Sequence, residues 1–246
     1  MNNHQTVVSP EAARADYARL YQTLGIDPKL HLITPQTLRV ERALSASSNN
    51  YLFDFRENSS SDRPLENKLN QNDMFAMTHI ALGITKQNES TTPKQYGNFK
   101  TLHTPDPNYF VGNGGNEHRG LNTLYNGKIT IKTDNVDRLP EFPASILEYI
   151  PERGYTKLAA PQTQDEWPQR GPGLHEFFKL VPQVILNGQQ NNSANLTLGQ
   201  GDIINIAGGI NPAGDGIVPE TNVVVLLLHG FLISNAADPQ LRWNII

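Results

Sequence analysis

One segment of the chain could contribute to nucleophilic catalysis, and it ends in His229-Gly230. An aliphatic run, residues 223–228, precedes this pair, as the strand before the oxyanion loop of an α/β-hydrolase does. That fold requires a Gly-x-Ser-x-Gly elbow further along the chain, followed by an acid and a histidine. Only fifteen residues follow Phe231, and no such elbow occurs in the sequence. We therefore interpret residues 223–233 as a buried strand with a glycine bend.

Histidines and paired acids are the other side chains that could do chemistry. None of the seven histidines has the His-Glu-x-x-His or His-x-His spacing that brings two imidazoles to one metal. Asp165 and Glu166 beside Trp167 could serve glycoside hydrolysis, but 24 acidic residues produce such neighbours by chance. We therefore predict no catalytic residue, no cofactor and no enzyme, and no metal ligand can be assigned. Only a distant metal site near His103 and His118 stays open.

Composition excludes several further classes of protein. Cysteine is absent, so thiolate zinc sites, cysteine nucleophiles and disulfides are excluded. The net charge is −4 and no three basic residues follow one another, so we expect no direct binding of nucleic acid. The first residues lack the basic start and apolar run of a secretory signal. The 19 Gly and 17 Pro, with abundant Asn, Ser and Thr, favour short strands joined by turns.

A helix is predicted near the N-terminus. Ser9 is suited to cap it, Pro10 to occupy its first position, and Gly25 to end it. Its apolar side chains recur at helical spacing and form one stripe: Ala13, Tyr17, Leu20, Tyr21 and Leu24. This stripe must cover the β-body or a neighbouring subunit, and we take its five residues as candidate subunit contacts. Residues 1–45 are thus interpreted as a polar arm and contact helix.

Beyond this helix the pattern indicates strands. Alternating or continuous apolar residues predict strands at 51–55, 73–85, 99–103, 177–186, 196–198 and 223–233. Asn126-Gly127 predicts a type I′ hairpin turn before a strand from Ile129. Residues 134–174 contain six prolines and are expected to form an extended crossing with one short strand near 146–150.

Roughly eight widely spaced strands favour an all-β fold, a jelly-roll β-sandwich or barrel over residues 46–246. A compact double jelly roll, divided near residues 135–174, is the alternative. Neither a fixed repeat nor the close strand spacing of immunoglobulin-like sandwiches is present.

The overall order of these features resembles the major capsid proteins of tailless, icosahedral, lipid-containing bacteriophages. The features are the helix at 9–25, the long strand 73–85, the turn motifs Leu124-Tyr125-Asn126-Gly127 and Leu186-Asn187-Gly188, Asn191-Asn192, and the aliphatic strand 223–233. In that family two fused jelly rolls are usual and the subunits form trimers, and this chain is short for that pattern. The resemblance implies a self-assembling shell subunit, synthesised in the host cytoplasm and located in the virion.

The resemblance also implies partners: copies of the chain in trimers or larger assemblies, other capsid proteins, and an internal membrane surface. Two other functions stay open. One is a carbohydrate- or receptor-binding β-sandwich module, such as a vertex or spike protein, in which exposed Trp and Tyr would line a groove. The other is a hydrolase that uses His229 or the pair Asp165 and Glu166.

Overall fold

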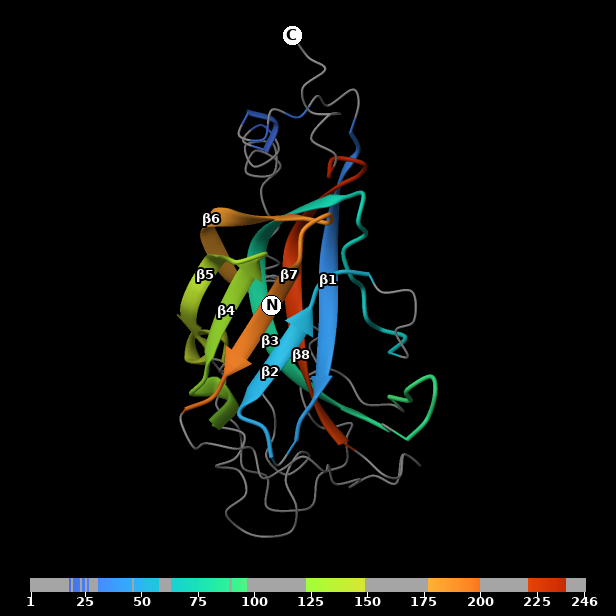
Figure 1. Ribbon diagram of the computed structural model, residues 1–246, viewed down its shortest axis with the longest axis vertical. Coiled ribbons are helices and arrows are strands. Elements are labelled where there is room, and N and C mark those ends of the chain that lie inside the picture. The colour runs from blue at the N-terminus through green and yellow to red at the C-terminus, as the bar shows by residue number, and fades with distance from the viewer. Residues whose placement is uncertain are drawn as a thin grey trace, which may run out of the picture.

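The structure is a computed structural model, and it describes residues 18, 20–22, 24, 26, 31–45, 47–57, 63–88, 90–96, 123–148, 177–199 and 221–237. These residues form an all-β sandwich of two antiparallel sheets with four strands each (Figure 1). The strands are β1 (Ile33–Ala43), β2 (Asn50–Asp54), β3 (Met74–Gln87), β4 (Lys128–Thr133), β5 (Val136–Pro143), β6 (Phe178–Asn187), β7 (Asn192–Thr197) and β8 (Thr221–Ile233). One 3-10 helix, η1 (Ala144–Leu147), follows β5.

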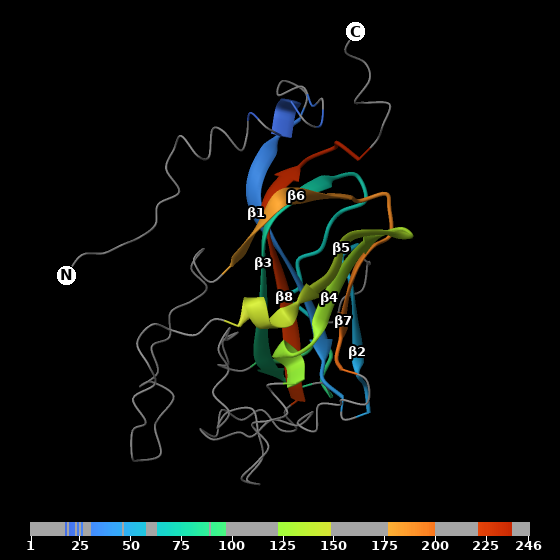
Figure 2. The ribbon, with the colours of Figure 1, turned by 90° about the vertical axis from the view of Figure 1, so that its left-hand side faces the viewer.

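The strand order is that of one long hairpin rolled into two layers. Sheet A has the order β1-β8-β3-β6 and sheet B the order β2-β7-β4-β5. β4 and β5 form the tip of this hairpin, joined by the two residues Asp134 and Asn135, and Asp134 has a φ of 52°. Outward from the tip, β3 pairs with β6, β2 with β7 and β1 with β8, all antiparallel. Successive pairs fall in alternate sheets, which face each other in Figure 2.

The two sheets differ on their outer faces. In β4 the buried Ile129 and Ile131 alternate with the exposed Lys128 and Lys132, so sheet B is apolar inside and polar outside. In sheet A the central strands β3 and β8 are buried at almost every residue, on both faces. A strand that is buried on both faces is expected to be apolar throughout, and this explains the unbroken aliphatic run at residues 223–228.

Several strands predicted from the sequence are confirmed. The ranges 51–55, 73–85, 177–186 and 223–233 correspond to β2, β3, β6 and β8. The range 196–198 overlaps the end of β7, which begins earlier, at Asn192. The range 99–103 lies outside the described residues.

The predicted hairpin turn at Asn126-Gly127 is wrong. Residues 123–125 form a helical turn that leads directly into β4, and Asn126 does not have the positive φ that a type I′ turn requires. The hairpin is made eight residues later, by Asp134 and Asn135. Consequently the segment from residue 134 begins with the strand β5 rather than with an extended crossing, and residues 144–147 are 3-10 helix rather than strand.

The N-terminal part of the chain contributes a strand to the sandwich. β1 lies inside residues 1–45, which the sequence assigned to an arm and contact helix, and it pairs with β8 over its full length. Residues 18, 20–22 and 24 are helical, and the remainder of 9–25 lies outside the described residues. The described strands on the two sides of residues 135–174 pair with one another in both sheets.

Irregularities mark the two edge strands β5 and β6, which lie on the same side of the sandwich (Figure 1). The pairing of β5 with β4 shifts register twice, and Pro140 lies within the first of these shifts. In β6 the four residues 180–183 face the single residue Thr78 of β3, and Val181 in this bulge is 76% exposed. Bulges and prolines prevent an edge strand from pairing with a further strand.

Candidate functional site

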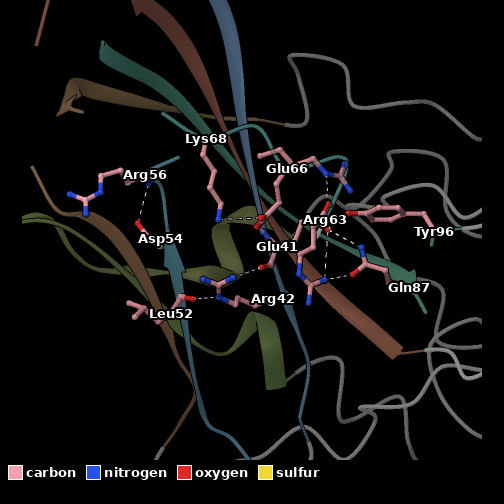
Figure 3. A network of polar contacts seen from close by, with 11 residues as sticks. Glu41, Arg42, Leu52, Asp54, Arg56, Arg63, Glu66, Lys68, Gln87 and Tyr96 are labelled. Atoms are coloured by element: carbon pink, nitrogen blue, oxygen red, sulfur yellow. Dashed lines mark hydrogen bonds and ion pairs between the residues drawn. The ribbon is translucent and has the colours of Figure 1, made fainter. Parts of the chain in front are cut away.

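The outer face of sheet A carries two groups of polar side chains that are buried or partly buried. The first consists of Arg39, Glu41, Arg63, Gln87 and Tyr96, and we call it the Glu41 cluster (Figure 3). The second is a pair of histidines on neighbouring strands, His79 and His229. Both groups are candidates for chemistry because titratable residues in fully or partly desolvated positions occur often at functional sites.

Strand alternation places Glu41 on the outer face. Leu38 and Val40 of β1 point into the core, so Arg39 and Glu41 point away from it. The Glu41 side chain is nevertheless completely buried. A buried carboxylate is stable only when charges and hydrogen-bond donors surround it.

Four side chains surround the Glu41 carboxylate. Arg39 donates from Nε to Oε1 at 2.6 Å, and Gln87 donates from Nε2 to Oε2 at 3.3 Å. The Tyr96 hydroxyl donates to Oε2, and Arg63 Nη1 lies 4.0 Å from the same oxygen. Arg63 also donates to the Gln87 amide oxygen. The cluster therefore joins β1, β3 and the two connecting segments that hold Arg63 and Tyr96.

The Tyr96 hydroxyl stays protonated in this environment. Burial raises the pKa of Tyr96 far above its ordinary value, and the hydrogen bond and negative charge of Glu41 raise it further. Tyr96 is thus a hydrogen-bond donor to the Glu41 carboxylate. Its ring also lies under the Arg39 guanidinium, 6.0 Å from the ring centre.

A second carboxylate extends the cluster along β1. Glu66 accepts a hydrogen bond from the backbone nitrogen of Glu41 at 3.0 Å. Lys68 forms an ion pair with this second carboxylate, with Nζ 3.2 Å from Oε2 of Glu66. Two backbone hydrogen bonds of 2.8 and 2.9 Å between Arg39 and Asn67 hold the same segment against the strand. Because no part of the Glu41 side chain reaches the surface, its carboxylate is not accessible to a substrate. The cluster binds two connecting segments to sheet A.

The histidine pair belongs to a row across sheet A. Register aligns Thr37 of β1, His229 of β8, His79 of β3 and Lys179 of β6. The two imidazole rings lie 5.9 Å apart, and Phe177 packs edge-on against His229 at 6.0 Å. No carboxylate belongs to this row of four.

Threonine hydroxyls hold both imidazoles by Nδ1. Thr37 Oγ1 lies 3.0 Å from Nδ1 of His229, and Thr78 Oγ1 lies 2.8 Å from Nδ1 of His79. The single proton of the Thr78 hydroxyl is donated to the His229 carbonyl at 3.2 Å. Thr78 must therefore accept from His79, which places the proton of neutral His79 on Nδ1.

This row gives a pH-dependent prediction for stability. Burial lowers the pKa of His229 below 6.5, so the unfolded chain binds a proton more readily than the folded one. The contribution of His229 to the free energy of unfolding is therefore largest above the pKa that this histidine has in the unfolded chain. It decreases as the pH falls below that value. We expect the melting temperature to decrease between about pH 7.5 and pH 5, and less steeply in His229→Gln.

Thermal melts of both proteins across this range measure the difference. His31→Gln, which removes an imidazole outside the row, is the comparison variant. Equal slopes in the wild type and His229→Gln contradict the assignment.

The structure places three of the five candidate subunit-contact residues. Leu20 is fully buried, and Tyr21 and Leu24 are partly buried. They pack against the chain's own sheet, with Ile26, Ile33, Met74, Ala76, Ile233 and Ala236. Contact with a second subunit through this stripe stays a prediction. Ala13 and Tyr17 lie outside the described residues, as do His103, His118, Asp165 and Glu166.

In the described ranges, histidine, aspartate and glutamate side chains nowhere gather in a group of three or more that could hold a metal ion. Among the helices of the described part of the chain, none has the length and apolar content needed to cross a membrane.

Sequence reasoning did not identify the Glu41 cluster. Arg39 and Glu41 alternate with Leu38 and Val40, and this pattern could have indicated a charged pair on one face of a strand. The partners Arg63, Gln87 and Tyr96 come from distant positions, and no local pattern connects them.

None of the protein-family models, curated proteins or solved structures compared with the chain matches it.

Proposed function

We propose that the sandwich is a single jelly roll and that the protein is a structural subunit of an icosahedral virus capsid. The observation that carries the proposal is the strand order, β1-β8-β3-β6 facing β2-β7-β4-β5. An eight-stranded chain rolled into two such sheets is the architecture of viral capsid domains, and also of lectins and cupins. Among these three kinds of protein, the resemblance of the sequence to bacteriophage capsid proteins favours the capsid function.

The edge strands of the sheets support an assembly in which copies contact one another through side chains rather than by strand pairing. A shell of many copies needs contacts that are specific and that stop at a closed size. The bulges of β5 and β6 oppose open-ended strand addition. The apolar side chains of Val136, Phe178 and Val181 on the same two strands are exposed. The ring of Phe142 on β5 packs against the ring of Phe178 on β6, with 5.2 Å between the ring centres. Neighbouring copies, other capsid proteins, and a location in the virion are parts of the same proposal.

The test is the assembly state of the purified full chain. We expect sedimentation velocity and negative-stain images to show trimers or larger closed particles that form reversibly with concentration. Val181→Asp should weaken assembly without lowering the melting temperature, because the side chain is 76% exposed in the single chain. A species that stays monomeric at high concentration and under crowding contradicts the proposal. Binding of such a monomer to glycans would favour the lectin-like function instead.

A further inference from the structure

Both edge strands on one side of the sandwich carry a bulge, and this is the side that faces the viewer in Figure 2. In β5 one residue, Arg138, is extra in the pairing with β4. In β6 the bulge of residues 180–183 contains Val181. A bulge bends its strand and redirects a side chain, so Arg138 and Val181 stand outside the regular rows of their two sheets.

Residues of both bulges line one hollow of about 500 Å³ that is open to solvent. Its apolar walls come from both sheets and from the N-terminal helical residues, and they include Leu24, Met74, Leu139, Leu180 and Val184. This volume is within the range of pockets that hold small ligands. The hollow therefore has room for an apolar side chain of another molecule.

The same side of the molecule presents apolar side chains that the single chain leaves uncovered. Val181 is 76% exposed, and Phe178 on the same strand is 38% exposed. Removal of such side chains from water favours association. Because Val181 also lines the hollow, a projecting apolar side chain stands at the rim of an apolar hollow.

A second copy of the chain fits this combination of projection and hollow. A two-fold axis brings the same surface of two copies together, so each feature meets the complementary feature of the other copy. The Val181 side chain of one copy can then enter the hollow of the other, and the reverse contact is made at the same time. A second copy supplies both features by symmetry, whereas a different partner would need a surface that happens to carry both.

The charges on β5 are also self-complementary. Arg138 is exposed and forms no ion pair within the described part of the chain. Asp137 and Glu141 lie on either side of it along the strand, with side chains that are 46% and 74% exposed. Their ion pairs with lysines of β4 are exposed and contribute little. A two-fold axis across β5 reverses the order of these charges, so Arg138 of each copy can face an acidic residue of the other.

We propose that the β5–β6 side binds a second copy of the chain about a two-fold axis, with Val181 of each copy in the hollow of the other. This contact rests on the proposed function, in which copies of the chain must touch, and it identifies where they do so. An icosahedral shell has two-fold axes as well as three-fold axes, so the contact can join trimers. The bulges prevent the edge strands of two copies from pairing, and the copies meet through side chains.

Cross-linking through a single introduced thiol tests this contact. The chain has no cysteine, so Val181→Cys carries a single thiol. At a protein concentration at which sedimentation shows association, we expect a short bismaleimide to convert most of this variant into dimers on a denaturing gel. Leu52→Cys is the matched control, because Leu52 is 57% exposed on β2, at the opposite side of the sandwich. This control should give no dimer.

The charge of Arg138 provides a second measurement. In the Val181→Cys chain, Arg138→Glu places like charges opposite each other and should remove most of the cross-linked dimer. Arg56→Glu makes the same change at an exposed arginine beyond β2 and should leave the dimer yield unchanged. Equal yields in the two charge variants would contradict the contact.

Two results overturn the two-fold contact while the chain still assembles. One is the absence of cross-linked Val181→Cys dimers. The other is a dimer that forms only when Val181→Cys and Leu52→Cys are mixed, because it shows a head-to-tail contact between opposite sides of the sandwich. Conversely, Val181→Cys dimers from a chain that never forms larger particles would support the two-fold contact and contradict the capsid proposal.

Discussion

Glu41→Ala is expected to lower the free energy of unfolding by about 3–5 kcal/mol, the usual loss when one partner of a buried ion pair is removed. The substitution leaves the guanidinium groups of Arg39 and Arg63, which are only 18% and 11% exposed, without the carboxylate that compensates them. Arg39 already has a buried Nη2 that makes no hydrogen bond to any residue that the structure describes. Equilibrium denaturation in urea measures the change.

Asp137→Ala is the matched control for this experiment. Asp137 forms an ion pair with Lys132 at 3.2 Å, but both side chains are about half exposed, at 46% and 47%. An exposed pair of this kind contributes less than about 1 kcal/mol, so the control should unfold close to the wild type. Similar losses in the two variants would mean that the Glu41 cluster does not stabilise the sheet.

Leu20→Ala is expected to cost about 2–5 kcal/mol of stability in the isolated chain. Leu20 is fully buried between the N-terminal helical residues and the end of sheet A, where Met74 and Ile233 contact the same cluster. Truncation leaves a cavity there, because the strands on either side are fixed by their hydrogen bonds. Denaturation of the monomeric fraction gives the value.

Gln22→Ala, on the exposed side of the same helical segment, should change the stability by less than about 0.5 kcal/mol. The comparison also distinguishes the two roles that the sequence left open for the apolar stripe. If Leu20 served only a contact between subunits, its truncation would weaken assembly while the single chain unfolded as before.

The all-β class and the central strands could be predicted because their signals are local. The run Val223–Leu228 and the long apolar stretch of β3 are buried on both faces, and such strands are continuous in sequence. Asn126-Gly127 has the composition of a hairpin turn, yet the helical turn at 123–125 makes tertiary contacts through the buried Leu124 and Tyr125. Packing of these two side chains outweighs the local turn preference.

The polar interior could not be predicted in the same way. The burial of Glu41 depends on Arg63 and Tyr96, 22 and 55 residues away, which reach it only after the strands have formed. The strand predicted at 73–85 ends before Lys86, whereas β3 continues to Gln87 and its register with β8 turns the Lys86 side chain inward. Sequence periodicity gives the face of a strand, but it does not say how far the core extends along that strand.

The rolled hairpin also determines when each pairing can form during folding. β4 and β5 are joined by two residues, whereas Thr37 of β1 and His229 of β8 are 192 residues apart. Contacts between distant residues carry the largest loop-closure cost, so we expect slow folding that proceeds outward from the β4–β5 tip. β1 is synthesised first but obtains its partner last, only after β8 has left the ribosome. Until then the nascent chain exposes an unpaired strand, and its yield in a cell should depend on chaperones that cover it.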